Sequence, residues 1–183
     1  MSNKQKGFTL LELMVTLAIV GIVASIVLWN SSDMLEENRA ESFLLELKRN
    51  ISYARSQAAS TDEIVILCAG PQNQVKNNQD KIQCKNEWGE NKMIIVFIDS
   101  NNDGEYTRLS DSLLRVMDKI SSQDKLTFTG NEKRLRFNTS GRITTEPGDF
   151  VFCPANSSDN NKALTVSQAG SSFYLGKTSQ KCG

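Results

Sequence analysis

The chain has 183 residues, with 21 Lys or Arg against 21 Asp or Glu and no histidine. A net charge of zero leaves no bulk positive charge that would draw the chain onto nucleic acid or acidic lipid. The lack of histidine excludes Cys/His zinc sites and Cys–His nucleophiles, and the length allows one domain of moderate size.

An apolar segment follows a short basic start. Lys4 and Lys6 precede a run from Phe8 to Leu28 in which Glu12 is the only charged residue. The run is long enough for a membrane-spanning helix, which needs roughly 20 residues. No further Lys or Arg occurs until Arg39, so we expect the N-terminus in the cytoplasm and the remainder outside the inner membrane. A carboxylate inside such a segment is costly, which marks Glu12 as a functional candidate with a partner.

Two simpler interpretations of this segment compete. A removed secretory signal peptide has an apolar region of roughly 7–15 residues and a small-x-small cleavage site. Here the run is longer and ends in Leu28-Trp29-Asn30. A plain signal anchor accounts for the length and the orientation but leaves Glu12 without a role.

The apolar pattern changes after Leu28 and becomes that of an amphipathic helix. No proline occurs before Pro71, and apolar residues recur three or four positions apart. They are Leu35, Ala40, Phe43, Leu44, Leu47, Ile51, Ala54 and Ala58. We predict one continuous helix from about residue 8 to about residue 59, whose second half packs one apolar stripe on something else.

The remainder of the chain is typical of short strands separated by turns. The predicted strands cover residues 63–68, 93–99, 113–117, 126–129, 135–137, 150–153, 164–166 and 173–175. The polar segment 70–92 is expected to be a long loop. A long helix that carries a small antiparallel β head belongs to the α+β class.

Four cysteines fit an oxidising compartment outside the inner membrane. They are Cys68, Cys84, Cys153 and Cys182, and no two form a CxxC pair. Disulfide bonds are their expected use, and spacing alone leaves three pairings open.

The segment from Lys6 to Glu12 (KGFTLLE) resembles the class III signal of type IV pilins and type II secretion pseudopilins. The head resembles the GspH/FimT branch of that family in several segments. These are a strand ending in Cys68, a loop with Cys84 and Trp88-Gly89, the sequence IVFID at 95–99, FNTSGR at 137–142, and the late Cys182. The resemblance implies a long helix packed against two small antiparallel sheets.

The resemblance also implies how the chain is processed and divided. Prepilin peptidase is expected to cut between Gly7 and Phe8, after which the amine of Phe8 is methylated. Glu12 is expected to pair with the N-terminal amine of a neighbouring subunit and so set its register. The expected parts are a leader (1–7), a membrane or filament-core helix (8–29) and a periplasmic head (30–183). The resemblance favours disulfides Cys68–Cys84 and Cys153–Cys182.

The function implied by the resemblance is structural. The chain is expected to be a minor pilin or pseudopilin, located in the inner membrane and then near the tip of a type IV pilus or type II secretion filament. Its expected partners are prepilin peptidase, other minor and major subunits, and the inner-membrane assembly platform. No enzymatic activity and no cofactor are expected. The four-cysteine head favours the pilus.

One turn resembles the first half of an EF-hand calcium loop. Asp99, Asn101 and Asp103 precede Gly104, but the twelfth position is Ser110 instead of an acid. Asp and Asn before Gly are also what a tight β connection needs. A plain hairpin is therefore favoured over a calcium site.

A local cluster of basic residues raises the alternative of a DNA receptor in natural transformation. The cluster consists of Lys133, Arg134, Arg136 and Arg142. DNA-binding FimT-type minor pilins carry a Gly-Arg-x-Arg segment near the C-terminus. The matching stretch here, residues 167–173, has no arginine. A solvated basic face is therefore favoured over DNA binding.

Overall fold

The computed structural model describes residues 8–156 and 160–182, and it gives the backbone alone for residues 27–33 and Asn156. The chain divides into two compact units, Met1–Leu35 and Glu36–Gly183. Helix α1 (Leu10–Thr61) contributes to both units, and every strand of the described chain belongs to the second. The helix predicted between about residue 8 and about residue 59 is therefore confirmed.

The C-terminal end of α1 is closed by polar side chains and a left-handed residue. The hydroxyls of Ser60 and Thr61 donate hydrogen bonds to the carbonyl of Gln57, at 3.1 and 2.9 Å. Asp62 follows with a φ of 58°, in the region that commonly ends a helix. Asp is one of the few non-glycine residues that tolerate this conformation, so the helix stops here without a glycine.

The second unit contains two four-stranded antiparallel sheets, as the α+β prediction requires. In the first sheet the order is β5–β3–β1–β7, and in the second it is β10–β9–β8–β6. The first sheet contains β1 (Val65–Pro71), β3 (Lys92–Ile98), β5 (Ser112–Met117) and β7 (Arg134–Phe137). The second contains β6 (Lys125–Phe128), β8 (Gly148–Cys153), β9 (Lys162–Val166) and β10 (Ser172–Lys177).

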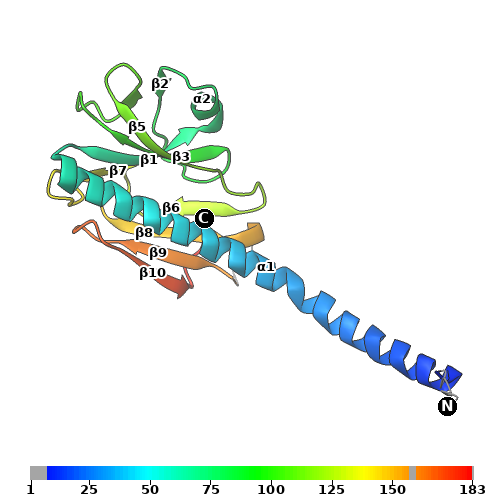
Figure 1. Ribbon diagram of the computed structural model, residues 1–183. Coiled ribbons are helices and arrows are strands. Elements are labelled where there is room, and N and C mark those ends of the chain that lie inside the picture. Colours follow the sequence, from blue (N-terminus) through cyan, green and yellow to red (C-terminus); the bar gives the residue numbers. More distant parts are fainter. Residues whose placement is uncertain (1–7, 157–159, 183) are drawn as a thin grey trace, which may run out of the picture. The chain divides into compact units, whose positions relative to one another are not determined.

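The second half of α1 packs one face against both sheets. Figure 1 shows this part of the helix in cyan, running along the two sheets. The fully buried helix residues are spaced four and three apart: Ala40, Leu44, Leu47, Ile51, Ala54 and Ala58. They share one core with Val96 and Leu135 of the first sheet and Phe150 and Phe152 of the second. Burying each large side chain contributes about 1.5–3 kcal/mol, so this stripe fixes the helix to the head.

Strands β1 and β3 are buried on both faces, which explains their nearly unbroken apolar sequences. On the face away from the main core, Ile66 and Phe97 form a second cluster with Ile82 and Tyr106. A cover made of α2 (Gln72–Lys76), β2 (Lys81–Ile82) and β4 (Tyr106–Thr107) supplies part of that cluster. The antiparallel pairing of β2 with β4 closes the cover.

The expectation of a plain loop over residues 70–92 was wrong. Gly70 and Pro71 pair with Met93 and Lys92 and so extend β1, and α2 and β2 follow. The segment is mostly polar in sequence because one side faces water. Its few apolar side chains, such as Ile82, turn toward the outer face of the first sheet.

Candidate functional site

The start of α1 is capped by the side chain of Thr9. The backbone N–H of Glu12 donates to Thr9 Oγ1 at 3.2 Å, and the N–H of Leu13 donates to the carbonyl of Thr9 at 3.1 Å. The Thr9 hydroxyl thus satisfies one donor that a helix start would otherwise leave open, and the Thr9 carbonyl accepts the first bond of the helix. Thr-x-x-Glu before an apolar run is the sequence pattern of a capping box, and this signal could have identified Thr9.

Phe8 and Glu12, which have different predicted roles, lie on either side of this cap. Phe8 precedes the helix and is 81% exposed, whereas Glu12 lies in the first helical turn with an exposed side chain. A carboxylate there is favoured by the positive end of the helix dipole. Gly7, the other residue of the predicted cleavage site, lies outside the described residues. The bond that is predicted to be cut therefore joins Gly7 to a non-helical, exposed Phe8.

The first turns of α1 expose apolar side chains on every side. The large residues from Leu10 to Ile26 are at least half exposed. Such a helix has no polar face to turn toward water, which marks a surface that another apolar environment covers. Within the part of the chain that the structure describes, no helix meets the combined length and hydropathy of a membrane span. The predicted segment 8–29 includes residues 27–29, whose side chains fall outside that description.

Two disulfides join Cys68 to Cys84 and Cys153 to Cys182, the pairing that the resemblance favours. The first ties the segment after β2 to the outer face of β1. The second ties the C-terminal segment to the last residue of β8. Both bonds hold peripheral segments onto the sheets.

The Asp99–Asp103 segment is a turn whose carboxylates bind backbone amides. Asp99 accepts the N–H groups of Asp103 and Gly104, each at 3.1 Å, and Asp103 accepts that of Glu105 at 2.8 Å. Burial raises the pKa of Asp99, against the opposing effect of the Gly104 N–H. Asn101 also donates its side-chain amide to Asp103. These contacts are those of the hairpin interpretation, and no metal-binding group of three or more His, Cys, Asp or Glu occurs among the described residues.

Only half of the predicted basic cluster is exposed, because its other two residues bind a neighbouring turn. Arg134 donates to the carbonyl of Gly104 and forms an ion pair with Glu105 at 3.8 Å, and Arg136 donates to the side chain of Asn102. Both arginines therefore bind the 99–105 turn. Lys133 and Arg142 are exposed. The four residues thus do not form one free basic surface.

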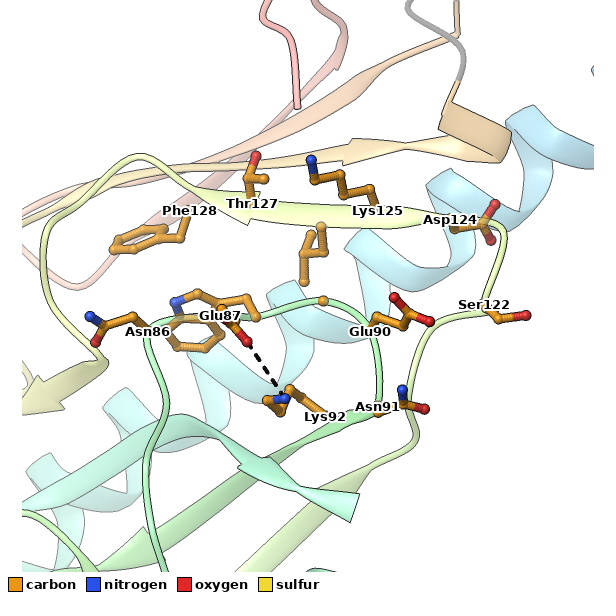
Figure 2. Close-up of a pocket in the computed structure, with 13 residues that line it drawn as sticks. Asn86, Glu87, Glu90, Asn91, Lys92, Ser122, Asp124, Lys125, Thr127 and Phe128 are labelled. Carbon is orange, nitrogen blue, oxygen red and sulfur yellow. Dashed lines mark ion pairs between the residues drawn. The ribbon is translucent and has the colours of Figure 1, made fainter. Parts of the chain in front are cut away.

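A polar hollow of about 720 Å³ lies between residues 86–92 and β6 (Figure 2). Lys92 pairs with Glu87 at 3.7 Å, while Lys125, Thr127 and Phe128 lie on β6 itself. Asp124, at one end, pairs with Arg39 at 3.3 Å and accepts the N–H of Ala155. Three of the charged side chains that line the hollow, Glu87, Lys92 and Asp124, are already paired within the head, so we interpret this hollow as a seam between elements.

One ion pair that involves a buried lysine could not be found from the sequence. Lys162, the first residue of β9, pairs with Glu37 of α1. A lysine at the start of a short strand carries no signal of burial. Its position follows only from the packing of the second sheet on the helix.

The family model described as type II transport protein GspH matches residues 45–170. The chain belongs to the GspH family. A second model, the prokaryotic N-terminal methylation motif, matches residues 2–28, the segment that contains Thr9 and Glu12. Comparison with curated protein sequences gives no significant match.

Solved structures support the same fold. Two crystal structures of the type IV minor pilin FimU from Pseudomonas aeruginosa (strain PAO1) are similar to the GspH-family chain. The one in space group P21 has a TM-score of 0.59 at 20% identity, covering 79% of this chain and 93% of that one. The one in P65 has a TM-score of 0.54 at 20% identity, covering 76% and 92%. With the family matches, they identify a structural subunit of the pilin and pseudopilin class.

Proposed function

We propose that the chain is a minor subunit of a type IV pilus or a type II secretion filament, assembled near the tip. The observation that carries this proposal is the exposed helix from Leu10 to Ile26, apolar on every side, within the segment that matches the methylation motif. In a membrane, and then in a bundle of like helices, its side chains leave water. The single helix serves both environments because both are apolar.

The proposed maturation begins with the positive charges before the apolar helix. Lys4 and Lys6 hold the leader in the cytoplasm, where prepilin peptidase cuts between Gly7 and Phe8. The freed amine of Phe8 is then methylated. The head, residues 30–183, lies in the periplasm, where its two disulfides persist.

Glu12 is proposed to set the register between subunits. Thr9 takes the backbone N–H of Glu12 and leaves its carboxylate exposed, and that carboxylate is in no ion pair within the described chain. The amine of Phe8 in the next subunit is its proposed partner. Pairing in an apolar bundle removes the cost of an isolated carboxylate there.

The fold neighbours favour the pilus over the secretion filament, because both are described as a type IV minor pilin. The proposed partners are the prepilin peptidase, other pilins and the assembly platform. DNA binding is not proposed, because Arg134 and Arg136 are engaged with the 99–105 turn.

Mass spectrometry of filaments sheared from cells tests this function. We expect the chain in the filament fraction, beginning with methylated Phe8. Gly7→Leu is expected to leave the precursor uncut, whereas Gly21→Leu, with the same change inside the apolar helix, is expected to be cut normally. A soluble chain that begins near residue 30 would contradict the proposal, and so would uncut chains in filaments.

A further inference from the structure

A small hollow at the end of α1 contains one arginine and several hydroxyls. It has a volume of about 520 Å³ and contains no Asp or Glu in its lining. The lining residues are Ser52, Arg55, Ser56 and Ala59 of α1, with Ser140, Gly170, Ser171 and Ser172 from two turns and the start of β10. All of them belong to the second unit.

Two glycines with left-handed backbones bring the turns close to Arg55. A Cβ on Gly141, whose φ is 69°, would lie 3.0 Å from Arg55 Cγ. A Cβ on Gly170, whose φ is 77°, would lie 2.3 Å from the carbonyl oxygen of Gly141 and 3.3 Å from Arg55 Cδ. Only glycine allows both approaches, so the stem of Arg55 is held between the two turns.

The guanidinium of Arg55 is oriented but has no counter-ion in the described chain. Its Nη1 donates to Ser171 Oγ at 2.9 Å. The ion pairs of the described residues use Arg39, Lys92, Arg134 and Lys162 instead. A guanidinium carries five N–H donors in a planar fork that matches a carboxylate, so donors remain for a second group.

We propose that this hollow receives one carboxylate side chain from a neighbouring subunit in the filament. The inference rests on the proposed function, which surrounds this chain with other subunits of a filament. One arginine with surrounding hydroxyls suits a single oxyanion. Nucleic acid is held by several cations along its backbone, and the head offers no net charge, with 19 basic and 19 acidic residues from Leu35 onward.

Incorporation of variants into filaments provides the first test. Arg55→Gln removes the charge, and we expect its incorporation to fall about tenfold, the scale of one charge-assisted hydrogen bond. Arg49→Gln is the matched control, because Arg49 is an exposed arginine on the same helix with no ion pair in the described chain. We expect it to incorporate like the wild type. Equal incorporation of the two variants would overturn the proposal.

Arg55→Lys keeps the charge and supplies an amine for a chemical test. In isolated filaments, a water-soluble carbodiimide should join Lys Nζ to the facing carboxyl carbon as an amide, with the lost water taken up by the carbodiimide. We expect a cross-link from position 55 to an Asp or Glu of another subunit, mapped by mass spectrometry. A well-incorporated Arg55→Lys without this cross-link would contradict the proposal.

Two further outcomes separate the possible failures. If wild type and Arg49→Gln are both absent from filaments, the proposed function is wrong and the carboxylate site with it. If they are present and full-length protein in detergent shifts duplex DNA in a manner lost in Arg55→Gln, the ligand is a phosphate and the carboxylate assignment is overturned.

Discussion

Lys162 at the start of β9 forms an ion pair with Glu37 of α1, and the lysine side chain is only 7% exposed. Glu37 is more accessible, so removing it leaves a buried ammonium without its partner. Removing Lys162 leaves a carboxylate that water can reach. Breaking a buried pair from one side costs most when the remaining charge is the buried one.

We therefore predict that Glu37→Gln lowers the melting temperature more than Lys162→Met does. The comparison is made by thermal unfolding of the full chain in detergent, with Glu46→Gln as the control. Glu46 is an exposed glutamate of α1 in no ion pair of the described chain. A larger loss in Lys162→Met than in Glu37→Gln would show that the pair does not behave as a buried lysine with an accessible partner.

The same pair predicts how stability depends on pH. The hydrogen bond from Lys162, and then its charge, hold the pKa of Glu37 below its ordinary value of 4.5. This contribution is present above the unfolded pKa and is lost as the pH falls through the lower folded pKa. We expect the stability difference between wild type and Glu37→Gln, from urea unfolding, to shrink between pH 7 and pH 3. A constant difference would contradict this linkage.

At the alkaline end, burial alone lowers the pKa of Lys162, but the hydrogen bond and charge of Glu37 with other nearby groups outweigh it and raise the pKa above 10.5. The stabilisation is therefore complete below 10.5 and is lost as the pH rises through the folded pKa. The wild type should therefore lose the stabilisation from this pair in strong base. Lys162→Met, which lacks the pair, should show no such loss.

The two halves of α1 should respond differently to the same truncation. Leu47 is fully buried in the main core, whereas Leu13 is 56% exposed within the described chain. We predict that Leu47→Ala lowers the unfolding free energy of the head by about 2–5 kcal/mol. Leu13→Ala should leave that free energy unchanged and should instead weaken filament assembly. Urea unfolding and the yield in sheared filaments measure the two effects, and an equal loss of head stability would contradict the division.

The two disulfides should differ modestly in their effect on stability. They close loops with sequence separations of 16 and 29, for which loop entropy predicts about 3 and about 3.6 kcal/mol. Replacing Cys68 and Cys84 by Ala should also loosen the cover on the outer face of β1 and β3. Hydrogen exchange should then rise around Ile82 in this variant and stay unchanged there when Cys153 and Cys182 are replaced. The opposite pattern would contradict the assigned role of the first bond.

The spacing of apolar residues was enough to predict the helix and most strands, because each apolar stripe marks the face of an element that packs against the core. The stripe from Ala40 to Ala58 and the run 93–98 both lie in the core. The cover around Ile82 has too few apolar residues to show a period, since its burial comes from contact with a sheet distant in sequence. The hollow at Arg55 depends on backbone turns at Gly141 and Gly170, and no local pattern near residue 55 reveals it.

Glu12 provides the test of subunit register. Glu12→Gln keeps the shape of the side chain and the backbone N–H that Thr9 accepts, but it removes the charge. Since an unpaired carboxylate in the bilayer costs up to roughly 2.5–3.5 kcal/mol, we predict membrane insertion at least as efficient as in the wild type. Cleavage at Gly7–Phe8 should be normal, and the yield in filaments should be poor.

The variant Thr9→Ala distinguishes the role of the Glu12 carboxylate from the role of the helix cap. It removes the cap, at a cost of about 1 kcal/mol, and keeps Glu12 charged. We expect it to incorporate better than Glu12→Gln, because a weakened first turn still presents an anion to the amine of the next subunit. Immunoblots of membrane and sheared-filament fractions measure both variants. If Glu12→Gln enters filaments at the wild-type level, with the other subunits unchanged, Glu12 does not set the register.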